Sequence, residues 1–238
     1  MSRMTKLAAL TGLVFVTMCS LAYAGEEETK VKSTSFLTIL NNGGIVGHII
    51  ILSSVASLAL AIEHAITIRR DVLVPPEILG QIEALFEEEE YEEAMTLCES
   101  APNFLTNIIA AGLAKVGAGW DALQGALGEA ADNEAIKMYQ KISYLSLISQ
   151  IAPMLGLYGT VIGMIMAFNV IAQSEAAPSP AKLAHGIEVA LVTTAEGLTV
   201  AMPTVCIYFF FRNRVIRVVM EVGGITDELM ERFRPTEA

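Results

Sequence analysis

The sequence predicts an all-α membrane protein: three long transmembrane helices in the mature chain and a helical cytoplasmic domain, after a cleavable signal peptide. Hydrophobic residues make up 53% of the 238 residues, and the mean hydropathy is +0.53. Beyond residue 24, three apolar runs are each long enough to cross roughly 30 Å of hydrocarbon. Arginine and lysine residues gather at one end of each run, which is typical of cytoplasmic boundaries.

Residues 1–24 have the pattern of a secretory signal peptide. Arg3 and Lys6 precede an apolar stretch, and Ala22-Tyr23-Ala24 supplies a small-x-small cleavage site. The alternative is an uncleaved first span, although the run is short for a bilayer. Cleavage would leave residues 25–44 as an external N-terminal segment.

The first transmembrane helix is predicted over residues 45–68. Its first eighteen residues contain one strongly polar side chain, His48, and Arg69-Arg70 follows the helix, so this end is expected in the cytoplasm. Glu63 and His64 lie near the same end. We expect both to reach water as part of a solvated helix end rather than to form a proton relay.

A cytoplasmic helical domain is predicted over residues 69–144. Pro75-Pro76 interrupts the chain, and apolar residues then recur at helical spacing over residues 77–98. The acidic run 87–93 offers no ligand geometry, so we interpret it as a solvated turn between two short helices rather than a metal or partner site. Another helix is expected over residues 104–116.

The second transmembrane helix is predicted over residues 145–172, as the end of one long helix that begins near Asp121 without a strong breaker. Pro153 is expected to kink it. Three arginines after the third apolar run again indicate a cytoplasmic end. The remaining predicted parts are an external loop at 173–181, a third transmembrane helix at 182–211 and a cytoplasmic C-terminal helix at 212–238.

Composition and motifs argue against several classes of function. The formal net charge of −11 is the wrong sign for nucleic-acid binding. The three cysteines form neither a disulfide framework nor a metal-ligand spacing. The sequence also lacks a nucleophile motif, a phosphate-binding loop and CxxC or HExxH spacings. We therefore expect no enzyme activity, no metal and no cofactor.

Small residues interrupt the second span. Residues 152–165 carry no charge, yet they include three glycines, a proline and a threonine. Gly159 and Gly163 share a helix face, which lets a neighbouring backbone approach closely, and Thr160 adds a hydroxyl beside that contact. The residues predicted to serve helix packing are Gly156, Gly159, Gly163, Pro153 and Pro203.

The third span carries polar side chains where an ionised carboxylate costs several kcal/mol unless it is paired, hydrated or protonated. At ~100° per residue, an arc of roughly 80° holds His185, Glu188, Val192, Glu196, Thr199 and Pro203. This face would border a hydrated lumen that passes protons, or its groups would form interhelical hydrogen bonds. The candidate proton-pathway residues are Thr160, Thr194, Glu196, Glu188, Thr193 and Thr199.

Residues 152–165 and 186–203 together resemble the MotA/TolQ/ExbB proton-channel family, and are most similar to ExbB-type subunits. The resemblance implies that Thr160 and Thr194 match the family's pore threonines. The family's usual pore glutamate falls on Val189. Glu188 stands one residue early and Glu196 is an additional carboxylate, so either one could substitute, or the partner's aspartate could suffice.

The resemblance further implies a homo-oligomer, expected to be a pentamer, that encloses a dimeric ExbD-like single-span subunit and drives a TonB-like protein. The leading hypothesis is a proton-channel subunit of the bacterial inner membrane that converts proton motive force into work for outer-membrane transport. The mature N-terminus would be periplasmic and the C-terminus cytoplasmic. The alternatives are a TolQ-like envelope-maintenance subunit, a MotA-like stator subunit and a non-conducting membrane scaffold.

Overall fold

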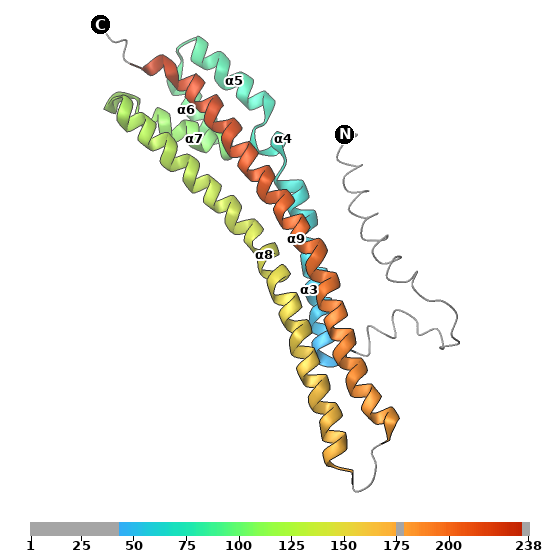
Figure 1. Ribbon diagram of the computed structural model, residues 1–238. Coiled ribbons are helices and arrows are strands. Elements are labelled where there is room, and N and C mark those ends of the chain that lie inside the picture. The colour runs from blue at the N-terminus through green and yellow to red at the C-terminus, as the bar shows by residue number, and fades with distance from the viewer. Residues whose placement is uncertain (1–42, 175–178, 235–238) are drawn as a thin grey trace. The chain divides into compact units, whose positions relative to one another are not determined.

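The computed structural model describes residues 43–174 and 179–234, in which all regular structure is helical (Figure 1). The predicted signal peptide at 1–24 and most of the predicted external segment at 25–44 lie outside the described residues. Part of the predicted external loop, residues 175–178, and residues 235–238 also lie outside them, and the all-α prediction is confirmed for the residues that are described. The helices are α3 (Gly44–Thr67), α4 (Arg70–Leu73), α5 (Pro76–Glu87), α6 (Tyr91–Ser100), α7 (Phe104–Leu113), η1 (Val116–Ala118), α8 (Trp120–Ala172), α9 (Pro180–Met230) and η2 (Glu231–Phe233).

Helices α3, α8 and α9 are each long and apolar enough to cross a membrane, so the prediction of three long apolar helices is confirmed. Helix α8 has 53 residues and continues through Pro153, so it covers about 80 Å at 1.5 Å per residue. This exceeds twice the hydrocarbon thickness of a bilayer. One continuous helix therefore joins the second span to the polar segment before it, as the sequence predicts. Helix α9 likewise continues through Pro203 and past residue 211 without a break.

The described residues divide into two compact units, which are treated separately below. Unit 1 contains residues 43–51 and 153–203, and unit 2 contains residues 52–152 and 204–234. Unit 1 therefore takes the first turns of α3, the last part of α8 and the first part of α9. Unit 2 takes the remainder of these three helices together with α4 to α7, η1 and η2.

Unit 2 is built around large apolar side chains. Helix α5 begins directly at Pro76, a residue suited to the first helical position because its missing N–H has no intrahelical partner there. Burying one Leu, Ile or Phe side chain contributes roughly 1.5–3 kcal/mol. The largest fully buried side chains of this unit include Val74, Ile82, Phe86, Leu105, Ile108, Ile109, Leu123, Ile142, Leu145, Val215 and Met230.

The middle of the acidic run, residues 88–90, forms an exposed turn between α5 and α6, as predicted, whereas its two ends lie within these helices. Glu89 adopts a left-handed φ of 62° in this turn. Repulsion from Glu93 raises the pKa of Glu90. Among the described residues, no group of acidic, histidine or cysteine side chains has metal-site geometry.

The end of α9 and η2 close onto the same region of unit 2. Phe86, Tyr91 and Phe233 pack as an aromatic cluster, with ring centroids 4.9–6.3 Å apart. Arg232 donates a hydrogen bond to the Phe86 carbonyl, and its guanidinium lies 5.3 Å from the centre of the Phe86 ring. A carbonyl near the end of α5 thus gains a side-chain partner.

Helix α7 starts with a capping box. The Asn103 side chain accepts from the backbone N–H of Thr106 at 3.0 Å, and the Thr106 hydroxyl accepts from the Asn103 N–H at 2.8 Å. Two backbone donors that α7 leaves unpaired are satisfied in this way. The helix predicted over residues 104–116 starts as expected but ends earlier, at Leu113, and the separate short helix η1 begins at Val116.

Candidate functional site

Glycines let α8 and α9 approach closely within unit 1. A Cβ atom added at Gly163 would lie 2.5 Å from the Gly186 carbonyl oxygen and 2.7 Å from the Ala190 nitrogen. Both atoms belong to the backbone, so neither can move aside as a side chain would. One added at Gly156 would lie 3.0 Å from the Thr193 carbonyl oxygen. The spacing of small residues therefore produces backbone-to-backbone contact, as such spacing does between membrane helices.

The contact is reciprocal. A Cβ atom added at Gly186 of α9 would lie 2.8 Å from the Gly163 carbonyl oxygen and 2.8 Å from the Ala167 nitrogen of α8. One added at Gly159 would overlap the Thr193 side chain. Side chains larger than hydrogen are therefore excluded on both sides of this crossing.

Three threonines lie at or beside this crossing. Thr193 is fully buried and donates to the Val189 carbonyl of its own helix at 2.9 Å. Thr194 is half-buried, and its Oγ1 lies 3.1 Å from the Ala190 carbonyl oxygen and 3.3 Å from the Gly156 carbonyl oxygen of α8. The half-buried Thr160 donates to the Leu157 carbonyl at 2.6 Å. Each hydroxyl has a carbonyl acceptor and keeps its own lone pairs for another donor.

Glu196 lies between α9 and the first turns of α3. The residue is 8% exposed, and neither carboxyl oxygen has a hydrogen-bond partner among the residues that the structure describes. A Cβ atom added at Gly47 would lie 2.8 Å from Oε2, and one added at Gly43 would lie 3.0 Å from it. The missing side chains of these two glycines leave the room that the carboxyl group occupies.

Two electrostatic effects compete at this carboxyl group. The N-terminus of α3 favours negative charge by about 0.3–1 kcal/mol in exposed settings. Removing an ion from water costs several kcal/mol unless hydrogen bonds replace its hydration. Glu196 accepts none from the first turn of α3, so the desolvation cost is the larger effect.

The six candidate proton-pathway residues therefore occupy different environments. Glu188 and Thr199 are exposed in the single chain, with Glu188 Oε2 3.8 Å from His185 Nδ1, whereas Glu196 is covered by α3. The arc expected to border one lumen is thus interrupted at Glu196, because the α3 glycines accommodate its carboxyl group. Val189, to which the resemblance assigns the family's usual pore glutamate, is buried with 6% exposure. Pro153 and Pro203 are half-buried within their helices.

Sequence reasoning missed the α3 side of this site. Gly43 and Gly47 stand four residues apart, so the small-residue spacing that was recognised in α8 is present here too. It also missed a hydroxyl pair in unit 2, where Thr204 Oγ1 donates to Ser57 Oγ at 3.2 Å and both residues are buried.

The expectation that His64 reaches water is wrong. His64 is 3% exposed, its Nε2 lies 3.1 Å from the Lys141 carbonyl oxygen of α8, and its ring contacts Phe211 edge-to-face. A tertiary contact with two other helices covers the ring, which position at a helix end does not reveal. Glu63, its neighbour, is exposed as expected.

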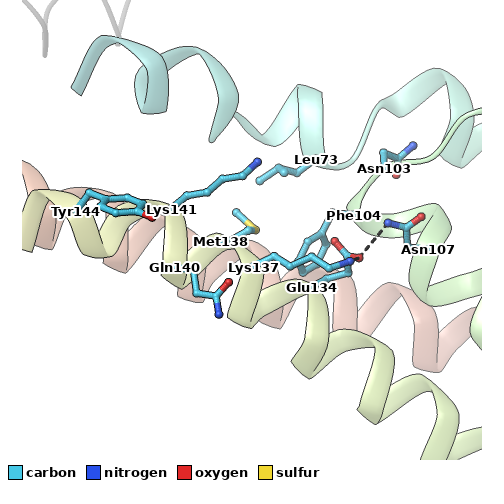
Figure 2. A pocket seen from close by; sticks show the side chains of 10 residues that line it. All are labelled: Leu73, Asn103, Phe104, Asn107, Glu134, Lys137, Met138, Gln140, Lys141 and Tyr144. Carbon is cyan, nitrogen blue, oxygen red and sulfur yellow. Dashed lines mark hydrogen bonds and ion pairs between the residues drawn. The ribbon is translucent and has the colours of Figure 1, made fainter. Parts of the chain in front are cut away.

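Unit 2 has an open cavity of about 440 Å³ between α4, α7 and α8 (Figure 2). Glu134 joins two of its polar groups, at 3.0 Å from Asn107 Nδ2 and 2.6 Å from Lys137 Nζ. Lys141 and Tyr144 line the same cavity. Glu134 compensates Lys137, so Lys141 is the cationic side chain of this lining without a carboxylate partner there.

Three long apolar helices, in contact through glycines and with buried hydroxyl and carboxyl groups, define a helical membrane protein with polar groups inside its spans. Within that class, the chain belongs to the MotA/TolQ/ExbB proton channel family, which matches residues 100–223. The match covers just over half of the chain. It includes the glycines and threonines of the α8–α9 crossing, and Glu196.

Curated relatives include both ExbB and TolQ proteins. A putative ExbB homolog of Methanothermobacter thermautotrophicus is 29% identical over 75% of this chain and 63% of its own length. The biopolymer transport protein ExbB of Salmonella typhimurium is 37% identical over 37% of this chain and 35% of its own. TolQ of Haemophilus influenzae, a Tol-Pal system protein, is 31% identical over 43% of this chain and 45% of its own length. The chain thus spans less than two thirds of the length of these relatives.

Proposed function

We propose that the chain is a proton-channel subunit of the bacterial inner membrane that works with an ExbD-like single-span subunit. Together they would convert proton motive force into mechanical work for TonB-dependent outer-membrane transport. The observation that carries the proposal is the α8–α9 crossing, where the Thr194 hydroxyl lies 3.3 Å from the Gly156 carbonyl oxygen inside the segment that matches the family. Hydroxyl and carboxyl groups in membrane spans are the groups that proton pathways use.

In the proposed assembly, several copies of this chain, expected to be five, surround the partner. Thr160, Thr194 and Thr199 supply hydroxyl groups to the pathway, and Glu188 and Glu196 supply carboxyl groups. Thr193 positions α9 against Gly159. The cationic ends of the spans favour a cytoplasmic C-terminus and a periplasmic mature N-terminus.

A TolQ-like role in envelope maintenance is the second candidate, and the similarity to TolQ of Haemophilus influenzae favours it. A MotA-like stator role and a non-conducting scaffold are the remaining alternatives. The neighbouring partner genes and the uptake phenotype separate the first two roles. A measured proton flux distinguishes the ExbB-like, TolQ-like and MotA-like roles from a non-conducting scaffold.

The test is proton flux into vesicles that contain the full chain together with the ExbD-like partner encoded beside it. We expect flux driven by a membrane potential, and loss of most of it in Thr160→Ala and Glu196→Gln. Ile136→Ala, at an exposed position of unit 2, serves as the matched control. Normal assembly with unchanged flux in both pathway variants would overturn the proposal.

A further inference from the structure

The carboxyl group of Glu196 points into a site that the helices themselves form. Gly43 and Gly47 lie against Oε2 on the α3 side, and the residue is more than nine-tenths buried. Both carboxyl oxygens lack a hydrogen-bond partner in the part of the chain that the structure describes. A buried polar group without a partner is rare in folded proteins and calls for an explanation.

The first turn of α3 alone does not explain this placement. Free N–H groups at a helix start stabilise a carboxylate when they bond to it, and Glu196 accepts no such bond. An unpaired buried carboxylate is costly, and such groups take up a proton instead. The packing is therefore compatible with Glu196 as a neutral carboxylic acid.

His48 is the titratable group beside this site. It follows Gly47 directly in α3, and a Cβ atom added at Gly47 would lie 2.8 Å from Glu196 Oε2. Its Nδ1 lies 2.6 Å from the Gly44 carbonyl oxygen, and because a carbonyl only accepts, Nδ1 carries the hydrogen. In the neutral ring, Nε2 is then an acceptor, and the residue is exposed.

We propose that Gly43, Gly47 and His48 of α3 form a proton-binding site around Glu196, in which the glycines accommodate the carboxylic acid and His48 exchanges its proton with water. In release, a water molecule takes the proton from the Glu196 O–H and passes it to His48 Nε2, which leaves a carboxylate and an imidazolium. The imidazolium then passes that proton to water. Uptake is the reverse, and no other reactant is required.

The inference deepens the proposed function, on which it rests for its role in proton transport. It also assigns a task to the extra carboxylate of this chain, at a distance of seven residues from Val189. Two helical turns separate these positions, so the site lies at a different level of α9 from the family's usual glutamate.

The test follows the carboxylic acid itself rather than flux. The full chain is reconstituted in lipid vesicles without its partner, and infrared spectra are recorded near neutral pH as water is exchanged for D₂O. We expect a carbonyl band of a protonated carboxylic acid that shifts on deuteration. The band should be absent in Glu196→Gln and unchanged in Glu63→Gln, which alters an exposed carboxylate of the same helix as His48.

Two further variants test the α3 side. His48→Gln should keep the band but slow its deuteration by about 10²-fold, the size of a general acid–base contribution, whereas His185→Gln should not slow it. Gly47→Ala should shift the band, because the added methyl group displaces Oε2. A wild type without the band, a band that survives Glu196→Gln, or deuteration unaffected by His48→Gln would each overturn the inference. Each of these outcomes can occur whether or not the complex conducts protons.

Discussion

The two units of this chain achieve tight packing in opposite ways. Unit 2 buries large side chains such as Phe86, Leu105 and Met230, which are stabilised mainly by van der Waals contact and by the area removed from water. Among the described residues of unit 1, Ile50 is the one large side chain that is fully buried, and α8 and α9 meet through Gly156, Gly159 and Gly163. We therefore expect substitutions that remove buried atoms to destabilise unit 2, and substitutions that add atoms at the glycines to destabilise unit 1.

The largest expected effect is a deletion in unit 2. Phe86→Ala should lower the free energy of unfolding by about 3–5 kcal/mol, because it leaves a cavity and removes the ring that Arg232 and Phe233 contact. Denaturant titration in detergent measures this change in the free energy of unfolding. Ile136→Ala, at a position 52% exposed, should stay within about 0.5 kcal/mol. Similar losses in both variants would contradict the assigned core.

The opposite change tests unit 1. Gly163→Ala adds one methyl group against backbone atoms at 2.5 and 2.7 Å, so the free energy of unfolding should fall by about 1–3 kcal/mol. Gly128→Ala on the same helix has open space around its Cβ and should raise stability by about 0.5–1 kcal/mol. A change of stability in the same direction in both variants would contradict the statement that close backbone contact at Gly163 excludes a methyl group.

A cap gives a smaller effect within unit 2. Asn103→Ala removes the side-chain acceptor for the Thr106 N–H and should cost about 1 kcal/mol. Asn103→Gly should lower the free energy of unfolding by only about 0.3 kcal/mol, since glycine tolerates the cap conformation. An unchanged free energy of unfolding in Asn103→Ala would show that the cap hydrogen bond does not stabilise α7.

The smallest effect at neutral pH concerns a buried thiol of unit 2. Burial raises the pKa of Cys98 to about 11 from a usual value of 9.0. Above pH 9 the unfolded chain loses this proton while the folded chain keeps it, so the contribution is present below pH 9 and is lost as the pH rises toward 11. Stability should therefore fall less steeply over this range in Cys98→Ala than in the wild type. Identical slopes would place the thiol in water.

Local sequence patterns predict much of this architecture. Apolar run length predicts the three spans, the missing breaker after Asp121 predicts the continuous α8, and the four-residue glycine spacing predicts the face that contacts α9. These are properties of one helix at a time.

Contacts between distant helices explain what sequence reasoning missed. His64 is buried because it packs against α8, where its Nε2 lies within hydrogen-bond distance of the carbonyl oxygen of Lys141, 77 residues away in the sequence. Glu196 is covered because α3 presents two glycines to it. Helical periodicity places a side chain on a face, but it does not say which other helix covers that face. The proton-pathway residues themselves stay a prediction.

The central claim is that contact between α8 and α9 through small residues positions the groups that carry protons. Its most direct measurement is potential-driven proton flux in vesicles that contain the chain and its ExbD-like partner, compared between Gly163→Ala and Gly128→Ala at equal assembly. The account predicts at least a tenfold loss, equivalent to about 1.4 kcal/mol, in Gly163→Ala and wild-type flux in Gly128→Ala. Wild-type flux in Gly163→Ala would contradict it.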